Sequence, residues 1–112
     1  MRMILACAAG MSTSLLANSI SKLAKARGLD ITVDAVSTSA LDEARWRSAD
    51  VVLVGPQMRH QLATLAQTGE KYRVPVAAIP PLDYATADAR HIIEQAYALI
   101  EQQAMRHDAG PP

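Results

Sequence analysis

The chain has 112 residues, enough for one domain that buries a core without a metal or disulfide staple. The chain has 11 basic residues (lysine and arginine) and 11 acidic residues (aspartate and glutamate). This balance gives no indication of binding to nucleic acid or to a membrane surface. The apolar runs are strand-sized, far shorter than a helix that spans a bilayer. The single cysteine excludes a disulfide within the chain and fits a reducing, cytoplasmic location.

Short apolar runs alternate with amphipathic stretches along the chain, the pattern of βαβ units rather than of hairpins. Strands are predicted at residues 2–7, 31–36, 50–54 and 76–79. Helices are predicted from about 13 to 27, around 41–47, from 56 onward and from about 87. The first of these helices ends at Gly28, a good C-cap.

This pattern predicts an α/β fold: a single domain with a four-stranded parallel sheet flanked by helices on both faces. The domain covers residues 1–105, and residues 106–112 form a flexible tail without an apolar stripe. In an open parallel sheet, ligands bind at the carboxyl ends of the strands. Cys7 ends the first strand there, and the loops at 37–39, 55–60 and 80–84 form the rim of the expected site.

A loop of small and hydroxyl residues follows Cys7 directly and leads into the first helix. Its residues are Ala8, Ala9, Gly10, Met11, Ser12, Thr13 and Ser14. Most lone cysteines are small core residues, but a core strand needs neither a glycine nor three consecutive hydroxyls after its last apolar position. A strand, a small loop and a helix start would direct backbone N–H groups and the positive helix end at the sulfur. Such a nest binds phosphate and favours the thiolate form.

Two stretches of the chain resemble the enzyme IIB component of the bacterial sugar phosphotransferase system, in its lactose/chitobiose/cellobiose branch. They are residues 4–16 (ILACAAGMSTSLL) and residues 52–59 (VLVGPQMR), with Asp83-Tyr84 as a weaker third match. The resemblance implies that Cys7 accepts a phosphoryl group from a histidine of enzyme IIA and passes it to a sugar bound by the membrane enzyme IIC. A β-linked disaccharide such as chitobiose, cellobiose or lactose follows from the family branch alone.

Within that family pattern, Cys7 is the nucleophile and residues 8–14 form the phosphate-binding loop. We expect backbone N–H groups from Ala8 to Thr13, and the hydroxyls of Ser12, Thr13 and Ser14, to bind phosphate. Gly10 permits a close backbone approach, and Met11 is a candidate contact for a partner protein. No cofactor is expected. Because Cys7 must meet enzyme IIA and then enzyme IIC, the interfaces with these partners should be small and transient.

The alternative is an enzyme like the low-molecular-weight tyrosine phosphatases or the arsenate reductases. These phosphatases share the strand, cysteine loop and helix, but they carry an arginine six residues after the cysteine, where this chain has Thr13. That arginine would clamp the transferring phosphoryl group, which threonine cannot do. A resolving thiol for arsenate reduction is also absent from the sequence.

The remaining titratable candidates are weaker. Asp83 could act as a general acid or base, but a turn or N-cap aspartate ahead of the last helix is favoured. Arg59 and His60 could touch phosphate or a partner, although a solvated helix face is equally consistent with their positions. No metal is expected, because the three histidines lack ligand spacing and no carboxylate cluster accompanies them in the sequence.

Overall fold

The computed structural model describes residues 1–8 and 11–108 of the chain. Its elements, in chain order, are β1 (Arg2–Cys7), α1 (Met11–Ala26), β2 (Thr32–Ser37), η1 (Thr38–Ala40), α2 (Glu43–Ser48), β3 (Val51–Val54), η2 (Pro56–Gln61), α3 (Leu62–Tyr72), β4 (Val76–Ala78), α4 (Pro81–Ala85) and α5 (Ala89–Asp108). Within the described ranges, no helix combines the length and the apolar character needed to cross a bilayer.

The four strands form one parallel sheet, as predicted, and the structure shows their order to be β2-β1-β3-β4. The central strand β1 pairs with β2 from Arg2 to Cys7 and with β3 from Met3 to Ala6. Residues 3–7 are buried, and so is all of β3. Continuous apolar runs of this kind are typical of strands covered on both faces.

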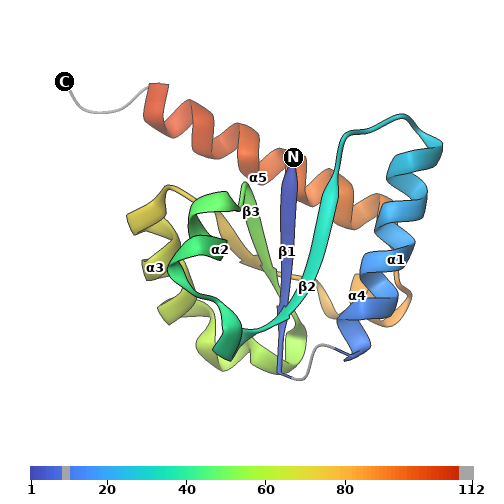
Figure 1. Ribbon diagram of the computed structural model, residues 1–112, viewed down its shortest axis with the longest axis horizontal. Coiled ribbons are helices and arrows are strands. Elements are labelled where there is room, and N and C mark those ends of the chain that lie inside the picture. The colour runs from blue at the N-terminus through green and yellow to red at the C-terminus, as the bar shows by residue number, and fades with distance from the viewer. Residues whose placement is uncertain (9–10, 109–112) are drawn as a thin grey trace.

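Helices cover both faces of the sheet (Figure 1). Successive side chains of a strand pack on opposite sides of the sheet, into two separate clusters. Met3 and Leu5 pack in a cluster with residues of α1 and α5. Ile4 and Ala6 pack in a second cluster that includes Trp46 of α2 and residues of η2 and α3. The carboxyl ends of the strands lie at the bottom of Figure 1, beside the start of α1.

The end of α1 confirms the predicted helix stop. Gly28 has a φ of 68°, a left-handed conformation that glycine adopts without steric cost. Leu29 N–H donates to the Ala24 carbonyl at 2.8 Å and Gly28 N–H to the Lys25 carbonyl at 3.2 Å. These two bonds form a Schellman motif, which turns the chain from α1 toward β2.

Several elements differ from the sequence predictions. The helix predicted from residue 56 is a 3-10 segment, η2, with a kink at Met58, and α3 begins only at Leu62. The rim loop predicted at 80–84 contains a short helix, α4, with Pro81 in its first turn. The last helix begins at Ala89, because Ala87 has a left-handed φ of 51°, and it continues to Asp108. It therefore runs into the segment 106–112 that we expected to be a flexible tail; residues 109–112 lie outside the described ones.

Candidate functional site

Cys7 is the last residue of the central strand, with neighbouring strands on both sides. Cys7 is buried, with a relative exposure of 2%. In the sheet register Cys7 lies opposite Ser37, the last residue of β2. On the other side is Gly55, which follows β3 and whose N–H donates to the Ala6 carbonyl at 2.8 Å. The backbone around the sulfur is thus fixed by two strands rather than by a loop alone.

The residues predicted to bind phosphate follow Cys7 in the chain, and four of them belong to the start of α1. Ala8 follows β1 directly and is exposed, whereas Ala9 and Gly10 lie outside the described residues. Met11, Ser12 and Thr13 form the first turn of α1, and Ser14 comes next on the helix, exposed to solvent. The helix thus starts earlier than the predicted residue 13. The first N–H groups of a helix have no acceptor within it and carry its positive dipole end, so an anion near this turn is stabilised.

Ser37 connects the end of β2 to the start of the cysteine loop. Its hydroxyl donates to the Ala8 carbonyl at 3.2 Å and lies 2.9 Å from the Ser39 hydroxyl. Ser39 N–H donates to the Ser37 hydroxyl at 3.3 Å, which caps the short helix η1. The predicted rim segment 37–39 therefore contacts the cysteine loop through hydrogen bonds.

Gly55 and Gln57 occupy the other side of Cys7. A Cβ atom built on Gly55 would lie 3.8 Å from Cys7 Cβ and 3.1 Å from Gln57 Oε1. The Gln57 carboxamide therefore extends back over Gly55 on the side of the sheet that carries the Cys7 side chain. The motif at residues 55–57 brings a polar group to the cysteine, which the spacing in the sequence does not reveal.

The other residues of the 55–60 segment are divided between core and solvent. Met58 is buried and packs in the cluster under α2 and α3. Arg59 and His60 are both exposed in η2. Burial of Met58 fixes the kinked segment and leaves the Arg59 and His60 side chains at the surface of the strand-end edge.

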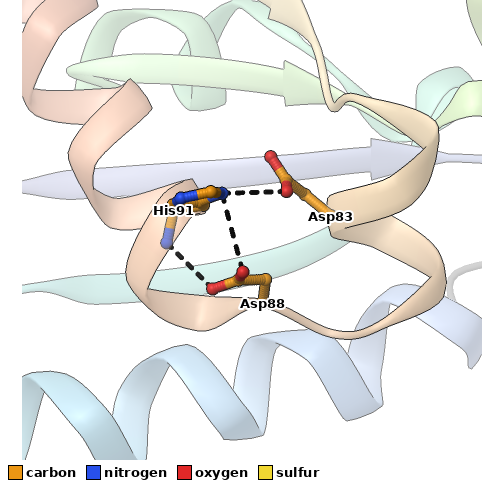
Figure 2. A group of neighbouring side chains, drawn as sticks. All are labelled: Asp83, Asp88 and His91. Carbon is orange, nitrogen blue, oxygen red and sulfur yellow. Dashed lines mark hydrogen bonds and ion pairs between the residues drawn. The ribbon is translucent and has the colours of Figure 1, made fainter.

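Asp83 faces His91 of α5, and Asp88 lies beside the same ring (Figure 2). His91 Nδ1 is 3.1 Å from Asp83 Oδ1 and 3.6 Å from Asp88 Oδ2. Asp88 Oδ1 also accepts a hydrogen bond from the His91 backbone N–H at 3.1 Å, so Asp88 caps α5. The hydrogen bond that the Asp83 carboxylate accepts from the ring, followed by the charge of Asp88, raises the pKa of His91 above its ordinary value of 6.5.

This cluster corrects two expectations. A carboxylate cluster does accompany a histidine, because the turn at Ala87 brings Asp83 and Asp88 to His91. Their ligand atoms lie within 4.8 Å of one another and are of types that hold divalent metals. The residue that caps the last helix is Asp88 and not Asp83. Asp88, an N-cap residue type directly before the apolar stripe of the last helix, was the sequence signal for that cap.

Comparison with known proteins gives a family. Residues 2–95 match the family model described as "PTS system, Lactose/Cellobiose specific IIB subunit". The oligo-beta-mannoside-specific EIIB component of Bacillus subtilis (strain 168) is 35% identical over 102 residues, covering 91% of this chain and 98% of that protein. The galactose-specific EIIB component of Lactococcus lactis subsp. cremoris (strain MG1363) is 35% identical over 100 residues, covering 86% and 93% of the two chains.

Solved structures agree with the fold. The cellobiose-specific phosphotransferase IIB component of Borrelia burgdorferi has a TM-score of 0.76 at 31% identity, covering 92% of this chain and 94% of that one. The lactose-specific IIB domain of Streptococcus pneumoniae has a TM-score of 0.74 at 16% identity, covering 87% and 97%, and supports the fold alone. The resemblance read from the sequence is therefore confirmed: the chain belongs to the lactose/cellobiose-specific IIB subunit family of the phosphotransferase system and is a phosphotransferase component.

Proposed function

We propose that this protein is a cytoplasmic phosphoryl carrier and that Cys7 holds the phosphoryl group. In the first step the Cys7 thiolate attacks phosphohistidine of enzyme IIA, so an S–P bond forms as the N–P bond breaks. The imidazole nitrogen that leaves takes up the proton lost by the thiol. In the second step a sugar hydroxyl oxygen attacks phosphorus, the S–P bond breaks, and the hydroxyl proton is released as the thiolate re-forms.

The observation that carries this proposal is the position of Cys7 between the end of a buried central strand and the first turn of α1. A charged phosphoryl group there would lie at the positive end of a 16-residue helix whose first turn carries no acidic residue. The 2% exposure of Cys7 limits access of water to the sulfur. A carrier needs both features, because it must stabilise the phosphoryl group without hydrolysing it.

The partners in this proposal are enzyme IIA as donor and the membrane enzyme IIC with its bound sugar as acceptor. Residues 8–14 bind the phosphoryl group, and Met11 remains a candidate contact with enzyme IIA. The sugar is a β-linked disaccharide of the lactose, cellobiose or chitobiose type. Relatives at the same 35% identity are specific by name for oligo-beta-mannoside, galactose and cellobiose, which is consistent with sugar selection by enzyme IIC.

The test is intact-mass spectrometry with site mapping after incubation with phosphoenolpyruvate, the general phosphotransferase proteins and enzyme IIA. We expect one phosphoryl group on Cys7, stable until enzyme IIC and sugar are added. Cys7→Ser should remain unphosphorylated, while Ser48→Ala serves as the control because the Ser48 hydroxyl bonds the Arg45 carbonyl within α2. Phosphorylation of Cys7→Ser at the wild-type rate would refute the assignment.

The same assay separates the phosphatase-like and arsenate reductase-like alternative. Catalytic turnover of an aryl phosphate, with no stable adduct from any enzyme IIA, would favour that enzyme class. We expect little turnover, because Thr13 stands where a phosphatase has its phosphoryl-clamping arginine.

A further inference from the structure

We propose that the Gln57 carboxamide is a further catalytic group of the Cys7 site, donating a hydrogen bond to the phosphoryl group on the sulfur. This inference rests on the proposed function, because it needs a phosphoryl group on Cys7. It gives a role to the Gly55-Pro56-Gln57 segment, which belongs neither to the predicted phosphate-binding loop nor to a strand of the sheet.

The placement of Gln57 follows from the sheet register. Ala6 pairs with Val54, so the next residues, Cys7 and Gly55, also lie side by side. Side chains of laterally neighbouring residues in a sheet point to the same face. Gln57 Oε1 and Cys7 Cβ both lie within 4 Å of the point where Gly55 would carry its Cβ. The carboxamide and Cys7 Cβ therefore both lie beside the open space over Gly55.

Glycine at position 55 leaves this approach open. Its φ is −60°, an ordinary value, so no left-handed conformation requires glycine there. What a Cβ would disturb is the Gln57 carboxamide at 3.1 Å, whereas the contacts to the Ala6 carbonyl at 3.5 Å and Cys7 Cβ at 3.8 Å are ordinary packing. A Cβ at this position would therefore require the end of the Gln57 side chain to shift by a few tenths of an ångström.

The backbone of Gln57 is held firmly although its side chain is exposed. Gly55 N–H donates to the Ala6 carbonyl at 2.8 Å, and Met58 N–H donates to the Gly55 carbonyl at 2.9 Å. Met58 itself is 7% exposed and anchored in the core. A side chain with a fixed base and a free end beside the cysteine is suited to close on a ligand.

The chemistry fits a phosphoryl group. A phosphoryl group extends beyond Sγ by one S–P and one P–O bond and presents three anionic oxygens. In this proposal the first N–H groups of α1 bind the phosphoryl group from the side of the helix, and Gln57 binds it from η2, which follows β3. A neutral amide adds a donor without the charge of an arginine, so it stabilises transferring charge less than a phosphatase clamp does.

The test compares Gln57→Ala and Gln57→Glu with wild type in the enzyme IIA assay, measuring the rate at saturating enzyme IIA, the KM for enzyme IIA and the half-life of phosphorylated Cys7. Gln57→Ala should lower the saturated rate roughly tenfold with unchanged KM, as expected for one lost bond to a charged group. Gln57→Glu keeps the length but carries a negative charge, so its rate should be lower still. Gln67→Ala, an exposed glutamine on α3, is the matched control and should behave as wild type.

Gly55→Ala provides an independent variant. It retains Gln57 but displaces the carboxamide, so it should slow transfer, and the Gly55→Ala/Gln57→Ala double variant should be no slower than Gln57→Ala. Wild-type rates in both Gln57 variants, a higher KM with an unchanged saturated rate, or independent effects in the double variant would overturn the inference. Those results leave the proposed function standing, whereas an unphosphorylated Cys7 in wild type would refute the proposed function itself.

Discussion

The substitution Gly69→Ala tests two effects on stability that oppose each other: helix propensity favours alanine, and packing opposes it. Gly69 lies in the interior of α3, where replacement of glycine by alanine normally stabilises a helix by about 1 kcal/mol. Here an added Cβ would lie 2.5 Å from the Val74 carbonyl oxygen and 2.6 Å from Val76 Cγ2. Real Cβ atoms do not approach other atoms so closely, so either the helix or the strand must move.

Neither neighbour can move cheaply. Val74 is 5% exposed, and its N–H donates to the Gly69 carbonyl at 2.8 Å. The next residue, Pro75, accepts a hydrogen bond from Val52 N–H of β3 at 3.0 Å, which ties this segment to the sheet. Overpacking a core typically costs up to roughly 3 kcal/mol. Subtracting the helix gain leaves Gly69→Ala destabilised by about 2 kcal/mol.

The assay is urea unfolding at 25 °C, together with a thermal melt in which the midpoint should fall by roughly 8 °C for a domain of this size. Gly28→Ala is the control, because a Cβ there meets nothing within 4 Å and only the φ of 68° opposes it. That control should cost about 1 kcal/mol. A Gly69→Ala protein as stable as wild type, with the same slope in urea, would refute the packing argument.

Three further substitutions test the electrostatics and the core. Because folding raises the pKa of His91, the protonated ring stabilises the folded state. This contribution to the free energy of unfolding is fully present below the ordinary pKa of 6.5 and is lost as pH rises through the folded-state pKa. The stability difference between wild type and His91→Gln in urea should therefore be larger at pH 6 than at pH 9, and equal differences would contradict the pairing with Asp83. Trp46→Ala removes a side chain that is 3% exposed and should cost about 3 to 5 kcal/mol in the same assay; a loss below about 1 kcal/mol would contradict its place in the core. Arg2→Gln breaks an ion pair with Asp34 whose partners are 46% and 41% exposed, so it should cost less than about 1 kcal/mol, and molar salt should erase the difference.

The sheet could be predicted from the sequence because burial on both faces leaves a simple signature. The central strands β1 and β3 are short, nearly continuous apolar runs, and the limits of all four strands were found to within one or two residues. The helix α4 could not be found in this way. Five residues opened by a proline carry no apolar period, and its last turn is fixed by Thr86 N–H donating to the Leu82 carbonyl at 3.0 Å. Local composition there resembles that of a loop.

The site was predictable in part for a similar reason. Cys7 is marked by its own sequence neighbours, so the strand, loop and helix around it could be read directly. Gln57 comes next to it only through the register between β1 and β3, and His91 meets Asp83 only through the turn at Ala87. Contacts of that kind depend on long-range geometry, which a pattern of residue types along the chain does not encode.

The place of Cys7 in the sheet also bears on how one protein can serve two partners in turn. A cysteine on an edge strand would have one neighbouring strand, whereas Cys7 follows the strand that is paired on both sides. Central strands of this kind open only with global unfolding, while the loops and short helices around them open at lower free energy. The nucleophile is therefore held at a constant position, and adaptation to each partner is left to the surface segments around it, such as α4. A relay requires this division, because both partners must reach the same sulfur atom through different contacts.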